Sequence, residues 1–326
     1  MLDTGIQGFA RINPGYASTF CPDRLSIGLV VPLEAYPDRA VPTMGAHIAR
    51  AQLAERLGFA ALWLRDVPFN VRSFGDAGQI YDPFVYLGAL ATATRDIALG
   101  VASVILPLRH PAHVAKAAAT VDQLSNGRLL LGIASGDRPE EYPALNMDYA
   151  SLGERFRDSV TYIRAMAEDY PRMRTAQGNL NGDADLLPKP FGGRLPLLVT
   201  GGSRQSPDWV AQNGDGWMTY PRDPLSQGRA VADYRRRVAE AGAHDKPVMQ
   251  SLYIDLADDA DAPPRPIHLG FSAGVRFLRD YLLDVQELGV NHVALNLRFN
   301  RAPVDDTMTR IADELLPDFT NKEVTQ

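Results

Sequence analysis

The sequence predicts an α/β fold, an eight-stranded parallel (β/α)8 TIM barrel with insertions at the rim where the strands end. Three observations predict it. Short apolar runs alternate with helix-period segments, the runs are continuously apolar as in strands buried on both faces, and eight such pairs follow one another. An open Rossmann sheet would need a glycine-rich fingerprint after the first strand, and residues 32–42 contain no glycine.

The predicted strands are apolar runs bounded by turn-forming or capping residues. In chain order they are 25–32, 60–66, 97–106, 128–135, 195–201, 216–220, 248–256 and 291–297. Residues 25–319 are therefore expected to form one barrel domain, with an irregular arm at 1–24, rich in Gly, Pro, Ser and Asn, and a tail at 320–326.

The helices between these strands are predicted from capping residues followed by apolar residues at helical spacing. Three of the caps directly precede a proline, which suits the first turn of a helix. The predicted N-caps are Thr43, Asp82, His110, Ser151 (with Glu154 as a capping box), Ser206 and Ser272. A helix over about 224–241 precedes the seventh strand, and a last helix ends near Pro317.

Composition narrows the class of protein. Apolar residues make up 45% and charged residues 22% of the chain, as in ordinary soluble enzymes, and the net charge of −6 argues against a nucleic-acid or anionic-membrane partner. Cys21 is the single cysteine, which excludes an intramolecular disulfide and a thiolate metal cluster. With neither a membrane-length apolar run nor the pattern of a secretory signal, we expect a cytoplasmic protein.

Barrel enzymes carry their chemistry at the carboxyl ends of the strands, and the loops there are unequal. The long loops at 67–81, 136–150 and 257–271 predict a roofed pocket, and 257–271 is expected to be a mobile lid because it is rich in Asp and Pro. Residues 171–194 form a further insertion, before the fifth strand, whose side of the barrel is left open.

The segment after the fifth strand has the composition of a phosphate site. Gly201 and Gly202 permit tight backbone geometry, and their amides, the Ser203 hydroxyl and the Arg204 guanidinium together suit a phosphate. The alternative is a plain turn. At the end of the fourth strand, Ser135 and Gly136 would let a planar ligand approach the backbone. The alternative there is a polar loop in which the next two residues, Asp and Arg, pair in solvent.

Charged residues at the rim are candidates for catalysis. Asp66 closes the second strand and Arg109 follows the third, so we predict that both act on the ligand; the alternative is an Asp66–Arg pair that only braces the rim. For His110, capping of the helix is favoured over acid–base catalysis. His113 and His292 have no partner at metal-ligand spacing, so no metal is expected. The tryptophans are expected to be packing residues.

Residues 106–136, LPLRHPAHVAKAAATVDQLSNGRLLLGIASG, resemble the most characteristic segment of the bacterial luciferase-like flavin-dependent oxidoreductases. That segment has a Pro-x-x-His-Pro turn, an alanine-rich helix and an Asp-Gln-Leu-Ser-x-Gly-Arg bridge into the fourth strand. Further matches in the family's order are Glu55-Arg56-Leu57-Gly58-Phe59, Gly153-Glu154-Arg155-Phe156 and Asp215-Gly216-Trp217. The resemblance covers about residues 25–319.

The resemblance implies a monooxygenase that oxidises a small organic substrate with dioxygen and reduced FMN, the flavin coming from a separate reductase, and it implies a homo-oligomer. Ala102 and Ser103 would lie at a third-strand bulge, often with a non-prolyl cis peptide, against the isoalloxazine ring. Ser135 and Gly136 would lie near the flavin tail, and residues 201–204 match the phosphate loop. One departure stands out: the family's luciferases have an acidic residue and two histidines where this chain has Asp66-Val67-Pro68, so light emission is not expected.

Three other functions remain open. A deazaflavin-dependent reductase or dehydrogenase would use the same scaffold. A lyase or isomerase without a redox cofactor would use the phosphate site alone. A flavin-binding protein without turnover would fit the absence of the histidine pair.

Overall fold

Eight parallel strands close into a barrel in the structure, a computed structural model that describes residues 8–319. The strands pair in the order β1, β2, β3, β4, β7, β8, β9 and β12, and β12 pairs with β1 again. They are β1 (Ser26–Val30), β2 (Ala61–Leu64), β3 (Ala98–Ile105), β4 (Leu129–Ala134), β7 (Leu197–Thr200), β8 (Gly216–Thr219), β9 (Val248–Leu256) and β12 (His292–Asn296). This confirms the predicted fold.

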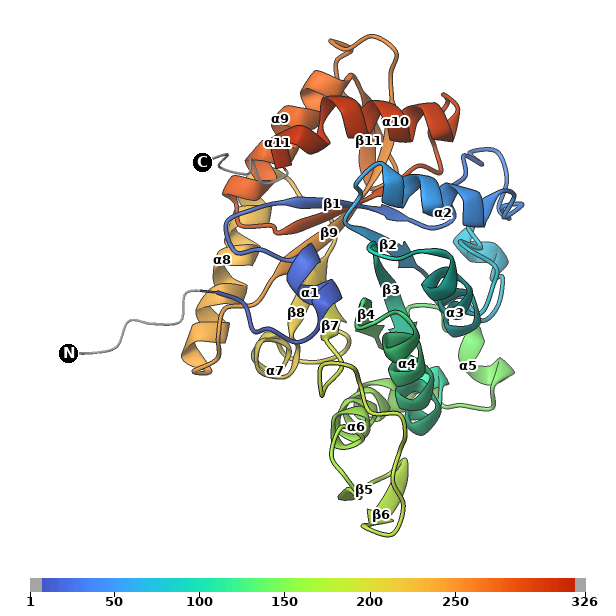
Figure 1. Ribbon diagram of the computed structural model, residues 1–326, viewed down its shortest axis with the longest axis vertical. Coiled ribbons are helices and arrows are strands. Elements are labelled where there is room, and N and C mark those ends of the chain that lie inside the picture. Colours follow the sequence, from blue (N-terminus) through green and yellow to red (C-terminus); the bar gives the residue numbers. More distant parts are fainter. Residues whose placement is uncertain (1–7, 320–326) are drawn as a thin grey trace, which may run out of the picture.

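One helix follows each barrel strand and packs on the outside of the barrel (Figure 1). These helices are α2 (His47–Arg56), α3 (Pro83–Ala93), α4 (Pro111–Leu124), α6 (Leu152–Ala165), α7 (Pro207–Asn213), α8 (Pro224–Glu240), α9 (Val275–Glu287) and α10 (Val304–Glu314). The predicted caps Asp82, His110 and Ser206 each accept a backbone N–H in the first turn of their helix. The shorter helices are α1 (Pro14–Thr19), α5 (Glu141–Ala144) and α11 (Leu316–Phe319).

Three predicted N-caps are wrong, because the side chains hydrogen-bond to groups other than the first turn of the expected helix. The Thr43 hydroxyl donates to Glu34 at 3.0 Å, and α2 begins only at His47. Ser151 has a helical backbone and makes no capping bond to α6. Ser272 lies in strand β11 (Gly270–Ala273), where its hydroxyl donates to Asp255 at 2.8 Å.

The amino-terminal arm, predicted as irregular, contains α1, which lies across the end of the barrel where the strands begin (Figure 1). The Asn13 side chain caps this helix and donates to Asp122 at 3.0 Å. The Tyr16 hydroxyl donates to the carbonyl of Asp215 at 2.6 Å, just before β8. Six residues are too few to show helical periodicity in a sequence, which is why the pattern missed α1. The predicted tail at 320–326 lies outside the described residues.

The barrel interior contains a hydrogen-bonded tryptophan and histidine among other buried side chains. Trp63 is fully buried, and a Cβ on Gly100 would lie 2.2 Å from its ring, so only glycine leaves room for the indole. The indole N–H donates to Nε2 of His292 at 2.8 Å, and Nδ1 of His292 lies 2.6 Å from the Ser26 hydroxyl. Burial lowers the pKa of His292 to about 3. His292 is thus a neutral packing residue below the site.

Two hairpins extend the barrel. The predicted loop 257–271 carries β10 (Arg265–Ile267), which pairs with β11, and β11 continues alongside β9. Its mobility stays a prediction. The insertion at 171–194 carries the hairpin of β5 (Arg172–Thr175) and β6 (Gly178–Asn181), which packs outside α6 and lies at the bottom of Figure 1. This insertion therefore does not roof the pocket.

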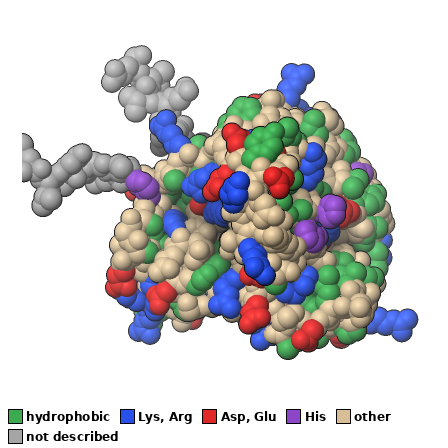
Figure 2. All heavy atoms as spheres, turned by 90° about the horizontal axis from the view of Figure 1, so that it is seen from below, with side chains coloured by type: hydrophobic (Ala, Val, Ile, Leu, Met, Phe, Trp, Pro, Cys, Tyr) green, Lys and Arg blue, Asp and Glu red, His purple; other side chains and the backbone are tan. Residues whose placement is uncertain are grey.

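The outer surface mixes charges of both signs. On the face shown in Figure 2, Lys and Arg side chains lie among Asp and Glu side chains rather than in a patch of one sign. Within residues 8–319, no helix is both long and apolar enough to cross a membrane.

Candidate active site

A cavity of about 890 Å³ opens at the end of the barrel where the strands finish. Its wall includes Ala102 and Ser103 of β3, Met218 of β8 and Asn296 of β12, so it lies directly above the filled interior. A groove of about 210 Å³ adjoins it, and the wall between the two is made of residues that line both: Arg65, Phe74, Ala102, Ser103, Asp137, Thr200 and Tyr220. Single-ligand sites span roughly 300–1,000 Å³, so the cavity has the size of a ligand site and the groove extends it.

The groove contains most of the predicted cofactor residues. Its lining includes Ala102, Ser103, Ser135, Gly136, Gly201 and Ser203. The pairing of β3 with β4 shifts register between Val101 and Val104, and the peptide between Ala102 and Ser103 is cis, as the family resemblance implied. The Ser103 hydroxyl is hydrogen-bonded to the Thr200 hydroxyl of β7, which fixes the bulge against the neighbouring strand.

The loop after β7 has the geometry of an anion-binding nest. Gly201, Ser203 and Arg204 have positive φ values of 54°, 44° and 59°. The backbone N–H groups of Gly202, Ser203 and Arg204 find no acceptor among residues 8–319. Successive free amides in such a turn form a concave site for an anion. The Arg204 guanidinium lies beside this nest and donates to the Tyr149 hydroxyl at 3.0 Å, with further donors left over.

The end of β4 forms a flat wall of the groove. Gly136 has a φ of 86°, and a Cβ there would lie 2.8 Å from Ile105 and 3.0 Å from the Tyr142 hydroxyl, so no larger residue fits. The alternative of a solvated Asp137–Arg138 pair does not occur. Arg138 is buried and lies over the Phe74 ring, 4.1 Å from its centre.

Asp66 and Arg109, predicted as catalytic, pair with each other. Asp66 is buried and accepts two hydrogen bonds from Arg109, at 3.0 and 2.7 Å, and one from the backbone N–H of Ile105 at 3.1 Å. Burial alone would lower the pKa of Arg109, but its hydrogen bonds to Asp66 and Asp82 raise it. These contacts match the alternative in which the pair braces the rim and holds the end of β3. Direct action on a ligand stays a prediction.

Three residues of the site were missed by the sequence analysis. Arg65 and Arg298 both line the cavity, and both pair with the buried Asp76, at 2.7 and 3.1 Å. The Tyr36 hydroxyl also donates to Asp76 at 3.0 Å. The alternation of strand side chains contained a signal: Arg65 stands two residues after Trp63 and so points toward the barrel axis as well. The sequence contained no such signal for Asp76, because this residue lies within a long loop.

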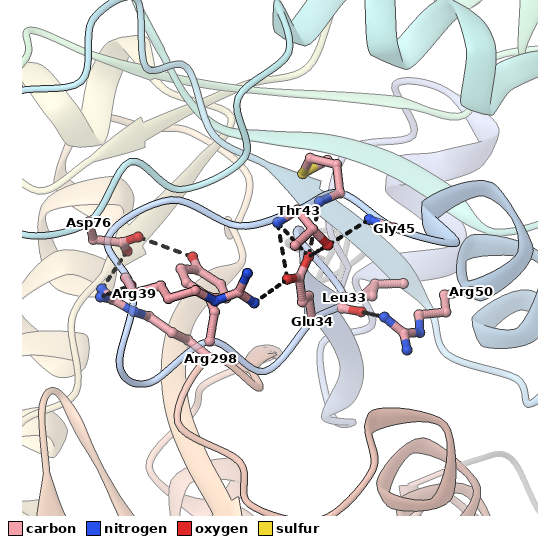
Figure 3. A network of polar contacts seen from close by, with 10 residues as sticks. Leu33, Glu34, Arg39, Thr43, Gly45, Arg50, Asp76 and Arg298 are labelled. Atoms are coloured by element: carbon pink, nitrogen blue, oxygen red, sulfur yellow. Dashed lines mark hydrogen bonds and ion pairs between the residues drawn. The ribbon is translucent and has the colours of Figure 1, made fainter.

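Figure 3 shows how this network continues into the loop after β1. Burial would raise the pKa of Glu34, but hydrogen bonds from Thr43, Met44 and Arg39 lower it, and the carboxylate thereby folds this loop around itself. Arg298 donates to the carbonyl of Arg39 at 3.2 Å, which joins the loop to the cavity wall. Hydrogen bonds from charged side chains thus hold the rim beside the cavity in place.

His268 is the histidine of the cavity wall. It lies in the turn between β10 and β11, with its ring 5.4 Å from that of Tyr253 and 6.4 Å from that of Phe299. His110, by contrast, accepts the N–H of Ala112 at the start of α4, as the capping interpretation predicted. In residues 8–319, no cluster of three or more His, Cys, Asp or Glu side chains is arranged to hold a metal ion.

A barrel with a bulged third strand, a nest after the fifth barrel strand and a large mouth cavity matches one family of oxidoreductases. The family model described as luciferase-like monooxygenase matches residues 19–320. Since this match spans nearly the whole sequence, the chain belongs to the luciferase-like monooxygenase family. The resemblance predicted from residues 106–136 is confirmed.

Individual relatives are distant. The oxygenase component of the flavin-dependent trigonelline monooxygenase of Acinetobacter baylyi is 32% identical over 187 residues, 56% of this chain and 45% of that protein. An F420-dependent secondary alcohol dehydrogenase with an F420–acetone adduct has a TM-score of 0.76 at 18% identity, covering 91% of this chain and 100% of that one. The oxygenating constituent of 3,6-diketocamphane monooxygenase of Pseudomonas putida, in complex with FMN, has a TM-score of 0.72 at 18% identity, covering 91% and 99%. Such low identities establish a common fold and leave the reaction open.

Proposed function

We propose that this chain is the oxygenase of a two-component flavin-dependent monooxygenase, which takes reduced FMN from a separate reductase and oxidises a small organic substrate. The observation that carries the proposal is the nest of free amides at Gly202, Ser203 and Arg204, which opens beside a groove at the barrel mouth. A relative named as an oxygenase component supports the two-component arrangement.

The donors present fit FMN. The three amides and the Arg204 guanidinium would hold its phosphate, and the flat wall at Ser135 and Gly136 would accept its tail. The Ala102–Ser103 bulge would meet its ring system, held in place by the Asp66–Arg109 pair as a positioning unit. When bound, reduced FMN supplies two electrons and reacts with dioxygen. The chain's own part is to bind, orient and exclude water.

We propose His268 as the acid–base group of the site. Val67 stands where luciferases have the first histidine, and His268 reaches the same cavity from the β10–β11 turn. An imidazole has one nitrogen that can accept a proton and one that can donate it, as acid–base catalysis requires. His268→Gln should lower kcat about tenfold or more and flatten its pH profile, with flavin affinity unchanged. An unaltered pH profile in this variant would remove His268 from the mechanism.

A deazaflavin-dependent dehydrogenase is the second candidate. The missing histidine pair and the likeness to an F420-dependent alcohol dehydrogenase favour it. The deciding experiment titrates the protein with FMN and with F420 by fluorescence and follows oxygen uptake with reductase-supplied reduced FMN. The proposal expects FMN to bind more tightly and oxygen uptake to depend on substrate. Tighter F420 binding without oxygen uptake would establish the second candidate. If the protein binds neither FMN nor F420, the remaining function is that of a lyase or isomerase without a redox cofactor.

We also propose a homo-oligomer. Three large apolar side chains at or just before the start of α3 are exposed: Ile80 is 48%, Tyr81 42% and Val85 76% exposed. Exposed apolar side chains close together along the chain are candidates for an interface between copies. Sedimentation that shows only monomer at micromolar concentration would refute this assembly.

A further inference from the structure

Arg65 presents unused hydrogen-bond donors to the 890 Å³ cavity. Its Nη1 donates to Asp76 at 2.7 Å, while Nε and Nη2 make no hydrogen bond to any of residues 8–319. Neither atom is fully buried, and Arg65 lines both the cavity and the adjoining groove. A guanidinium held on one side and free on the other is prepared for an acceptor oxygen.

Positive charge is in excess around this position. Arg65 and Arg298 share the single carboxylate of Asp76, and Nε of Arg298 is buried without a partner. Arg138 adds a third buried guanidinium, and its acidic neighbour Glu141 has a pKa raised to about 7 by burial, so it supplies only part of a negative charge. Asp137 at the cavity wall is exposed, where solvent screens it.

Aromatic rings form the walls around Arg65. Phe74 and Tyr220, from the loops after β2 and β8, are 42% and 48% exposed, and both line the cavity. Tyr253 of β9 and Phe299 after β12 face the same space and stand with ring centres 5.4 Å apart. Rings on several sides favour a planar guest, since aromatic pairs gain energy beyond the area that they bury.

We propose that the cavity binds an aromatic substrate carrying an anionic oxygen, a carboxylate or a phenolate, with that oxygen on the free donors of Arg65 and the ring among Phe74, Tyr220 and Phe299. The inference rests on the proposed function, because it takes the side of the groove at residues 201–203 for the cofactor and the cavity for the substrate, with Arg65, Phe74 and Tyr220 on the wall between the two. It names Arg65 as the residue that determines substrate class.

The test uses calorimetric titration of the FMN-saturated protein with three probes: 2-naphthoate, neutral 2-naphthylmethanol and the non-aromatic cyclohexanecarboxylate. We expect 2-naphthoate to bind about tenfold or more tightly than either of the others, because a charge-assisted hydrogen bond and ring packing each contribute. Arg65→Gln should weaken 2-naphthoate binding about ten- to hundredfold and leave 2-naphthylmethanol and FMN within about twofold.

Matched variants separate the two sites. Arg204→Ala should weaken FMN binding and leave the affinity for 2-naphthoate unchanged. Arg236→Gln, on the exposed face of α8, should change neither affinity. If Arg65→Gln does not fold, Arg65→Lys and Tyr220→Leu replace it. Arg65→Lys should weaken 2-naphthoate binding less than Arg65→Gln is expected to. Tyr220→Leu should weaken the binding of 2-naphthoate but not that of cyclohexanecarboxylate.

Two results would overturn the assignment. One is equal affinity for 2-naphthoate and 2-naphthylmethanol in the wild type. The other is an Arg65 variant that loses FMN rather than 2-naphthoate, which would make Arg65 a cofactor residue. Binding of 2-naphthoate by a protein that takes neither FMN nor F420 would support the anion subsite while refuting the proposed function.

Discussion

The two ends of the barrel differ in how their polar groups are used. At the end where the strands begin, α1 closes the opening, and Trp63, His292 and Ser26 hydrogen-bond to one another. At the other end, the amides of residues 202–204 and two donors of Arg65 have no partner among residues 8–319. Saturated polar groups stabilise a fold, whereas unsatisfied ones beside a cavity indicate a binding site. The contrast separates stability from function within one barrel.

Trp63→Ala tests the stabilising end and should have the largest effect. Removing a fully buried indole leaves a cavity and an unpaired His292, so the free energy of unfolding should fall by ~3–5 kcal/mol. Chemical denaturation measures this loss. Arg204→Ala, at the opposite end, is the control and should change stability by less than ~1 kcal/mol. Similar losses in both variants would end the distinction between the two regions.

Arg204→Ala tests the binding end. Loss of a charge-assisted contact to phosphate, worth ~1.5–3 kcal/mol, should weaken FMN binding by about one to two orders of magnitude. Fluorescence titration measures the dissociation constant, and Tyr149→Phe, which removes only the hydroxyl that Arg204 contacts, is the matched control. An unchanged affinity would show that the nest holds no phosphate.

Glu141→Gln tests a buried carboxyl behind the mouth. Burial raises the pKa of Glu141 to about 7 in the folded state, above its ordinary value of 4.5. Folding therefore favours the protonated form, and this contribution to stability is complete below pH ~4.5 and lost as pH rises through ~7. Relative to Glu141→Gln, the wild type should lose about 1–2 kcal/mol of unfolding free energy between pH 5 and 8. Parallel stability curves for the two proteins would contradict the raised pKa.

Arg109→Lys should have the smallest effect. Lysine keeps the positive charge beside Asp66 but not the two-pronged contact, so the end of β3 should be held less precisely. We expect kcat to fall about three- to tenfold, with FMN affinity within about twofold. Steady-state kinetics and flavin titration together check this. A loss confined to flavin affinity would make Arg109 a cofactor residue instead.

The sequence predicted the barrel because each strand is a continuous apolar run and each helix has apolar periodicity, signals that depend on local pattern alone. It also located the nest, since two glycines with Ser203 and Arg204 after a strand have few structural reasons to occur together. It missed α1, the use of Thr43 and Ser272 away from helix caps, and the Arg65–Asp76–Arg298 group. The helix α1 is too short to show periodicity, and the other groups depend on hydrogen bonds and ion pairs that a periodic pattern does not reveal.

Trp217 gives the molecule an internal optical reporter. Its indole N–H donates at 3.1 Å to the carbonyl of Gly201, the first residue of the 201–204 loop, while Trp63 lies buried in the barrel and Trp209 packs on Phe156 outside it. An indole's emission responds to its hydrogen-bonding partner and to a nearby absorbing ring. Comparing the wild type with Trp217→Phe therefore gives a label-free readout of whether the loop is filled, against a background from the other two tryptophans.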